Sequence, residues 1–116
     1  MSGIVSGPGD GERFDRDNRV VTIRADVGLL SAIEIEFDES FSVEPHRHED
    51  HADTFYVLEG EVEFTVDDEV VRAGPGTFVA APPGTRHGFR NPGPGPARIL
   101  NLHAPDTGFA DSIRRG

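Results

Sequence analysis

Short segments of alternating hydrophobic and polar residues recur along this chain. The clearest lies at 29–37, where Ile33 and Ile35 alternate with glutamates, and 61–66 repeats the pattern. A period of two is typical of a β-strand with one buried face and one face in water. These segments therefore predict antiparallel strands whose alternate side chains form a core.

Turn-forming residues separate these segments at short intervals. An aspartate pair at 67–68 and the segment 91–96, with three prolines and two glycines, interrupt the alternation, as such residues do at strand ends. The expected strands lie at 20–24, 29–37, 41–43, 54–58, 62–66, 69–72, 78–81, 86–90 and 97–103. The segment 109–114 predicts no more than a single helical turn. Many short strands with little helix predict an all-β sandwich or barrel.

The length and composition fit one domain. A chain of 116 residues, of which 35% are hydrophobic, can bury one core. Residues 1–17 are rich in glycine, aspartate and serine and predict a flexible N-terminal tail, which leaves 18–116 as the barrel domain. The chain contains no apolar run of membrane-spanning length and no signal segment, so the default expectation is a cytoplasmic protein.

The charge of the chain argues against several classes of function. Its net charge is -10, and all 11 basic residues are arginine. So acidic a surface predicts no binding to nucleic acid or to an anionic membrane. Because lysine and cysteine are absent, the chain can form neither a lysine Schiff base nor thiolate metal ligands.

Four of the five histidines lie within the segment 45–91. His46 and His48 are two residues apart, so on an extended strand both side chains point to the same face. Such a pair taken alone is more often two surface histidines than a metal site. Asp53 and His87 would add a carboxylate and a third imidazole, which completes a mixed nitrogen and oxygen ligand set for a metal ion.

The spacing of these residues resembles the first signature motif of the cupin superfamily. That motif is a glycine, five residues, His-x-His, three or four residues, a glutamate, six residues and a glycine. His46, His48, Asp53 and Gly60 fall in this register. Two positions depart from the pattern, since Asp53 replaces the usual glutamate and Ser40 stands where the opening glycine would fall.

The second signature motif of the same superfamily matches without a departure. It requires a glycine, five residues, Pro-x-Gly, two residues, a histidine, three residues and an asparagine. These positions are occupied by Gly76, Pro82, Gly84, His87 and Asn91. The resemblance implies a double-stranded β-helix, or jelly-roll barrel, that binds one divalent transition metal ion such as iron, manganese, nickel or zinc.

The resemblance further implies that His46, His48, Asp53 and His87 are the metal ligands. Asp53 is the least certain of them, because aspartate is one methylene shorter than glutamate. It could bind the metal directly, bind through water, or instead hydrogen-bond a ligand histidine and orient it. His51 could substitute for it, although a place in a loop or on the rim is the more ordinary interpretation of His51.

Other side chains are candidates for the chemistry around the metal. His51, His103 and Tyr56 are titratable groups that could serve as a catalytic base, each on weak grounds. For His103, a core histidine with satisfied hydrogen bonds is the more ordinary interpretation. Four phenylalanines share the strand parity of inward-facing residues and should form the core or wall a pocket: Phe55, Phe64, Phe78 and Phe89.

Two classes of function fit these features. The first is a small metalloenzyme with dioxygenase-, isomerase- or lyase-type chemistry at open metal positions, and the second is a small-ligand-binding or sensing protein with a structural metal. Both imply a small-molecule partner. The segment 54–58 is apolar on both faces and should be buried on both sides, which predicts a homodimer in which a second copy covers the outer face.

Overall fold

The structure, a computed structural model, describes residues 3–116. Met1 and Ser2, the start of the expected tail, lie outside the described residues. The described chain forms these elements: β1 (Glu12–Asp15), β2 (Arg19–Asp26), β3 (Ser31–Phe37), β4 (Ser42–His46), β5 (Ala52–Glu59), β6 (Val62–Val66), β7 (Glu69–Ala73), β8 (Phe78–Ala81), β9 (His87–Arg90), β10 (Ala97–Ala104) and α1 (Phe109–Arg115).

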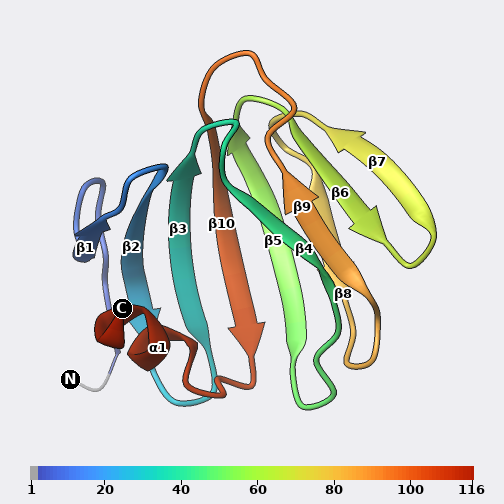
Figure 1. The fold of residues 1–116 in the computed structure, drawn as a ribbon. Helices are drawn as coiled ribbons and strands as arrows, with labels where there is room; N and C mark the ends of the chain where they lie inside the picture. Colours follow the sequence, from blue (N-terminus) through green and yellow to red (C-terminus); the bar gives the residue numbers. More distant parts are fainter. Residues whose placement is uncertain (1–2) are drawn as a thin grey trace.

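The strands form two antiparallel sheets (Figure 1). One has the order β1-β2-β3-β10-β5-β8, and the other has the order β4-β9-β6-β7. Some neighbours are consecutive in the sequence, such as β1-β2-β3 and β6-β7, whereas others come from distant parts of it, as when β10 inserts between β3 and β5. This arrangement confirms the predicted all-β jelly roll.

The core lies between the two sheets and follows the predicted alternation. In β3, Ile33, Ile35 and Phe37 are buried, and between them Glu34 is partly exposed. Phe89 of β9 packs edge-on against Phe37, with ring centroids 5.4 Å apart. Such aromatic pairs add packing energy to the burial of apolar area.

The segment expected to be a tail contains a strand. Residues 12–15 form β1, which pairs with β2 in the register Phe14↔Val21. The pairing uses backbone hydrogen bonds that hydrophobic patterning does not report. Closer to the N-terminus, the guanidinium of Arg24 donates hydrogen bonds to the carbonyls of Ser6 and Gly7 at 3.0 and 2.7 Å.

The outer face of β5 differs from the prediction that 54–58 is buried on both sides. Tyr56 points outward and is 38% exposed, whereas Phe55 and Val57 are buried. The prediction that Phe78 faces inward is wrong, because it is 56% exposed. The β5–β8 register explains this, since Phe78 pairs with the outward-facing Tyr56.

Helix α1 covers one end of the larger sheet (Figure 1). It is one residue longer than the predicted turn and begins after Gly108, whose φ of 98° favours glycine. Phe109 and Ile113 turn toward the core. Within residues 3–116, no helix is long and apolar enough to cross a membrane.

Candidate metal centre

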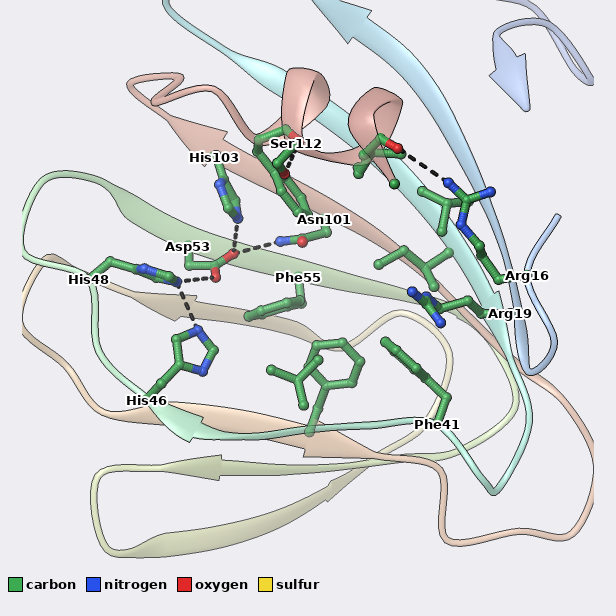
Figure 2. A pocket seen from close by; sticks show the side chains of 17 residues that line it. Arg16, Arg19, Phe41, His46, His48, Asp53, Phe55, Asn101, His103 and Ser112 are labelled. Carbon is green, nitrogen blue, oxygen red and sulfur yellow. Dashed lines mark hydrogen bonds and ion pairs between the residues drawn. The ribbon is translucent and has the colours of Figure 1, made fainter. Parts of the chain in front are cut away.

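A cavity of about 360 Å³ lies between the two sheets, and residues of α1 form part of its wall (Figure 2). Its walls are largely apolar and include Val43, Phe55 and Phe89. Three of the predicted metal ligands, His46, His48 and Asp53, line the cavity at one end (Figure 2). A cavity of this size and character suits a small organic molecule.

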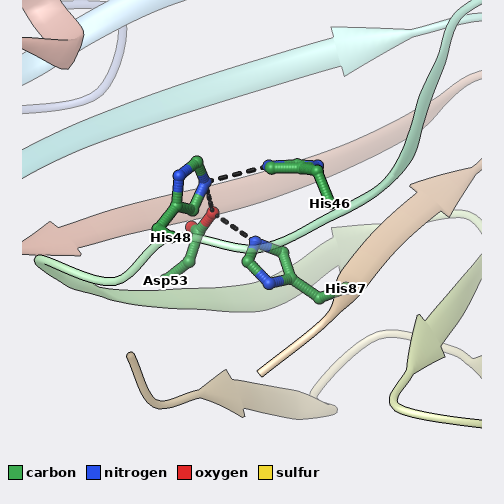
Figure 3. Close-up of side chains that lie close together, drawn as sticks. All are labelled: His46, His48, Asp53 and His87. Atoms are coloured by element: carbon green, nitrogen blue, oxygen red, sulfur yellow. Dashed lines mark hydrogen bonds and ion pairs between the residues drawn. The ribbon is translucent and has the colours of Figure 1, made fainter. Parts of the chain in front are cut away.

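The four predicted metal ligands come from both sheets and meet at this end. In the smaller sheet, β4 pairs with β9 so that His46 lies opposite His87. His48 follows β4 in the next loop, and Asp53 reaches the same point from β5 of the larger sheet (Figure 3). The strand pairing therefore joins two motifs that are separated in the sequence.

The atoms that would bind a metal face one another (Figure 3). His46 Nε2 lies 2.9 Å from His48 Nε2, and His87 Nε2 lies 2.9 Å from Asp53 Oδ2. His48 Nε2 lies 3.5 Å from the same carboxylate oxygen. The ligand atoms of this group all lie within 4.8 Å of one another, so a single ion could contact all four.

Two outer hydrogen bonds orient these imidazoles. His46 Nδ1 lies 2.8 Å from the carbonyl oxygen of Glu44, and His87 Nδ1 lies 2.8 Å from that of Thr85. A carbonyl oxygen accepts only, so each Nδ1 carries a proton and each Nε2 can offer its lone pair to a metal. The donor set therefore fits a divalent transition metal.

Asp53 is the centre of the hydrogen-bond network, and it is only 4% exposed. Besides His87, it accepts bonds on Oδ1 from Asn101 Nδ2 at 2.6 Å and from His103 Nε2 at 3.1 Å. Burial alone would raise the pKa of Asp53, but the hydrogen bonds from His103 and His87 outweigh it and hold the pKa well below its usual range. Asp53 is therefore a carboxylate at neutral pH.

The ligand histidines differ in protonation. Burial, followed by the nearby His51 and His46, lowers the pKa of His48 to about 4. Burial also acts to lower the pKa of His87, but its bonds to Asp53 and Thr85 act the other way, and the pKa is raised overall. In the metal-free protein, His48 is thus neutral at pH 7, and His87 retains a proton to higher pH than an ordinary histidine.

This difference predicts proton release when a metal binds. At a pH between the reference value of about 6.5 and the raised pKa of His87, the metal must displace the His87 proton, whereas His48 is already neutral. We expect release of about one proton per ion, declining as the pH rises above the pKa of His87. Calorimetric titration in buffers of different ionisation enthalpy measures it, and binding without proton release in this range would contradict the assignment.

Gly88 allows the two ligand strands of the smaller sheet to approach. A Cβ at Gly88 would lie 2.5 Å from the Val43 carbonyl oxygen and 2.8 Å from the Pro45 nitrogen. We expect Gly88→Ala to lower the free energy of unfolding by about 1–3 kcal/mol and to weaken metal binding, because β9 also carries His87. Urea unfolding and bound-metal analysis measure both effects.

The matched control is Gly74→Ala, since a Cβ at Gly74 meets nothing within 4 Å. This variant should change the free energy of unfolding by no more than about 0.5 kcal/mol. Equal behaviour of the two alanine variants would show that close approach at Gly88 does not hold the ligand strands together.

His51 and His103 are also brought to this cluster. His51 lies in the loop before β5, as one interpretation expected, but it is not on the rim, because it is buried at 4% exposure with Nδ1 bonded to Asp50 at 2.8 Å. Its ring stacks on His103, which stacks on Phe109 of α1 with ring centroids 4.0 Å apart. Among the described residues, His51 Nε2 and His103 Nδ1 are buried without a partner. Of these two histidines, His103 lines the cavity and His51 does not.

The remaining sequence candidates lie in different places. Phe55 and Phe89 line the cavity, whereas Phe64 belongs to the core beside it. Tyr56 and Phe78 are on the outer face of the barrel, so neither contributes to the site.

The sequence interpretation missed Asn101, whose hydrogen bond to Asp53, at 2.6 Å, is the shortest that this carboxylate accepts. Its signal was available, because Asn101 and His103 continue the inward-facing parity of Ile99 in β10 and are polar residues on a core face. It also missed Arg16 and Arg19, which line the cavity. Arg19 has the parity of the buried Val21 in β2, whereas nothing in the local sequence marks Arg16, which lies in the loop before that strand.

Comparison with known proteins bears on the family and the fold. The family model described as "Cupin domain" matches residues 33–103. The quercetin 2,3-dioxygenase of Bacillus subtilis strain 168 is 30% identical over 86 residues, which cover 71% of this chain and 26% of that protein. The chain thus spans about a quarter of the length of this relative.

Two solved structures have a similar fold. The structure of KdgF from a Halomonas species superposes with a TM-score of 0.80 at 28% identity, covering 90% of this chain and 94% of that one. An RmlC-like cupin from Shewanella frigidimarina NCIMB 400 gives a TM-score of 0.77 at 24% identity, covering 88% and 90%. The similarity extends over nearly the whole of each small chain.

Proposed function

The chain belongs to the cupin family, and on that premise we propose that it is a metalloenzyme acting on a small molecule. The convergence of three Nε2 atoms and one carboxylate oxygen at the end of an apolar cavity carries the proposal. Three imidazoles and one carboxylate are too few ligands to fill an octahedral ion, which leaves positions for substrate.

A bound ion would supply a Lewis acid that polarises a substrate oxygen. The residues of the chain provide the surroundings for this chemistry. Phe55 and Phe89 form an apolar part of the cavity wall that would contact a substrate. Asn101 holds the Asp53 carboxylate in place. His103, whose Nδ1 has no partner among the described residues, could accept or donate a proton at that atom.

The reaction class is an oxygenase, isomerase or lyase reaction. The partial similarity to a protein named quercetin 2,3-dioxygenase supports oxygen chemistry among these. That relative is much longer than the aligned segment, so its activity and substrate are not carried over to this chain.

Elemental analysis of the purified protein, followed by a substrate screen, tests the proposal. The protein as purified should contain iron, manganese, nickel or zinc, and bound iron would favour oxygen chemistry. Catechols, enols and keto acids should then be tested for oxygen uptake and for ultraviolet changes, with His87→Ala as the inactive reference. A metal-containing protein that binds such compounds without turnover would favour the ligand-binding function instead.

We further propose that the outer face of β5 and β8 is covered by a second copy of the chain. Tyr56 and Phe78 lie together there, with ring centroids 6.4 Å apart. We expect a homodimer at micromolar concentration by light scattering and a monomer for Phe78→Glu, because the variant places a charge in an apolar contact. The control is Val70→Glu on β7, also an exposed hydrophobic position. A monomeric parent chain would contradict the proposal.

A further inference from the structure

The cavity ends in two arginines on the side away from the metal centre. Arg19 is the first residue of β2 and has the parity of the inward-facing Val21, while Arg16 lies in the loop between β1 and β2. Figure 2 shows both side chains across the cavity from His46 and His48. The two ends of one cavity therefore differ in chemistry.

Neither arginine is neutralised by a carboxylate. Within residues 3–116, neither Arg16 nor Arg19 has a side-chain carboxylate within ion-pair distance, although six other arginines do. Arg16 donates to the carbonyls of Asp15 and Ile113 at 3.3 and 3.2 Å. Both acceptors are neutral carbonyl oxygens, so neither is a counterion for the positive charge of Arg16.

Arg19 is similarly placed. Its Nη1 donates to the side-chain oxygen of Asn18 at 3.0 Å, and its Cζ lies 4.6 Å from the ring centroid of Phe41. Within residues 3–116, no hydrogen bond engages its other guanidinium nitrogens, which can act as donors. Half-buried cations without counterions are costly, and an anion entering the cavity would relieve that cost.

The charge of the whole chain strengthens this argument. With a net charge of -10, the protein as a whole repels anions. Asp53 is the only acidic side chain among the described residues that line the cavity, and it lies at the metal end. Two unpaired arginines in such a protein therefore make the opposite end selectively attractive to an anion.

We propose that Arg16 and Arg19 bind the carboxylate of the substrate. The class of substrate is an organic acid with an apolar body, a carboxylate at the arginine end and an oxygen at the metal end. The apolar body would contact Phe41, Val43 and Phe55, which lie along the cavity. This assignment deepens the proposed function and depends on it for the oxygen at the metal end.

Binding of 3-phenylpropanoate and of its uncharged analogue 3-phenylpropanamide tests the arginine end. Both are titrated calorimetrically into the protein as purified, with metal content measured on the same sample. The carboxylate should bind at least about tenfold more tightly than the amide, because hydrogen bonds to charged groups are the stronger ones. Arg19→Met and the double variant Arg16→Met, Arg19→Met should lose this preference.

Arg72→Met is the charge-matched control, since Arg72 is an exposed arginine paired with Glu61 on the other sheet. It should retain the preference. If the double variant loosens α1, because it loses the hydrogen bond from Arg16 to the Ile113 carbonyl, the single variant Arg19→Met is sufficient to test the preference for the acid. Equal binding of acid and amide by the parent chain would overturn the assignment, as would a preference that survives the double variant and disappears in His87→Ala. If the protein as purified contains no metal and still binds the acid more tightly than the amide, the result would contradict the proposed metalloenzyme function and support the arginine site.

Discussion

Replacing His87 by alanine is expected to remove most of the bound metal from the protein. The change deletes one of the four converging ligand atoms and leaves Asp53 Oδ2 without its closest partner, now 2.9 Å away. Loss of a partner that only orients a ligand costs about 10–100-fold in metal affinity, and loss of a ligand should cost more. Metal analysis after dialysis measures the effect, and the double variant His46→Ala, His48→Ala should behave in the same way.

His51→Ala is the informative comparison for this prediction. His51 is buried beside the cluster, with ring centroids 4.2 Å from His48, but its ligand atoms are not part of the four-residue group. This variant should retain the metal. Full metal content in His87→Ala together with loss in His51→Ala would show that the buried group of His51, Asp53 and His103 binds the ion instead.

Replacing Asp53 by alanine is expected to affect both metal binding and folding. The change removes the shared acceptor of Asn101, His87 and His103 from a buried position. Breaking a buried, hydrogen-bonded charge pair typically costs about 3–5 kcal/mol. We expect a loss of this size in the free energy of unfolding of the metal-free protein at pH 7, measured with urea, and weaker metal binding.

The pH dependence of this loss follows from the lowered pKa of Asp53. The carboxylate contributes stability that is present above its unfolded pKa of about 3.9 and is lost as the pH falls through the lower folded value. The difference in the free energy of unfolding between the parent chain and Asp53→Ala should therefore shrink below pH 4 and persist at neutral pH. A difference that is constant over this range would contradict the charged role.

Asp53→Glu separates a ligand from a residue that only orients a ligand. If Asp53 binds the metal, glutamate can supply the same oxygen and the metal should remain bound. If Asp53 only orients His87, the longer side chain should misplace that imidazole and weaken binding by about 10–100-fold. X-ray absorption counts the oxygen neighbours of the ion directly, and we expect a protein oxygen among them.

The local pattern of the sequence was sufficient for the fold class and for the metal motif. Strand parity in β3 predicted the burial of Ile33, Ile35 and Phe37, and side chains two apart on a strand share a face whatever the remainder of the chain does. The spacing of His46, His48, Asp53 and His87 resembles the cupin motifs, and this resemblance predicted them as metal ligands. The structure brings all four to one point.

Strand partnership and sheet orientation were decided only by the tertiary structure. Phe78 is a large apolar residue of the kind that usually lies in a core, but it pairs with the outward-facing Tyr56 and is therefore exposed. Asn101 meets Asp53 because β10 inserts beside β5, an arrangement that depends on strands far apart in the sequence. Arg16 and Arg19 also reach the cavity through the tertiary arrangement of the strands. The spacing of residues along the chain determines the face on which a side chain lies, whereas long-range pairing determines what that face contacts.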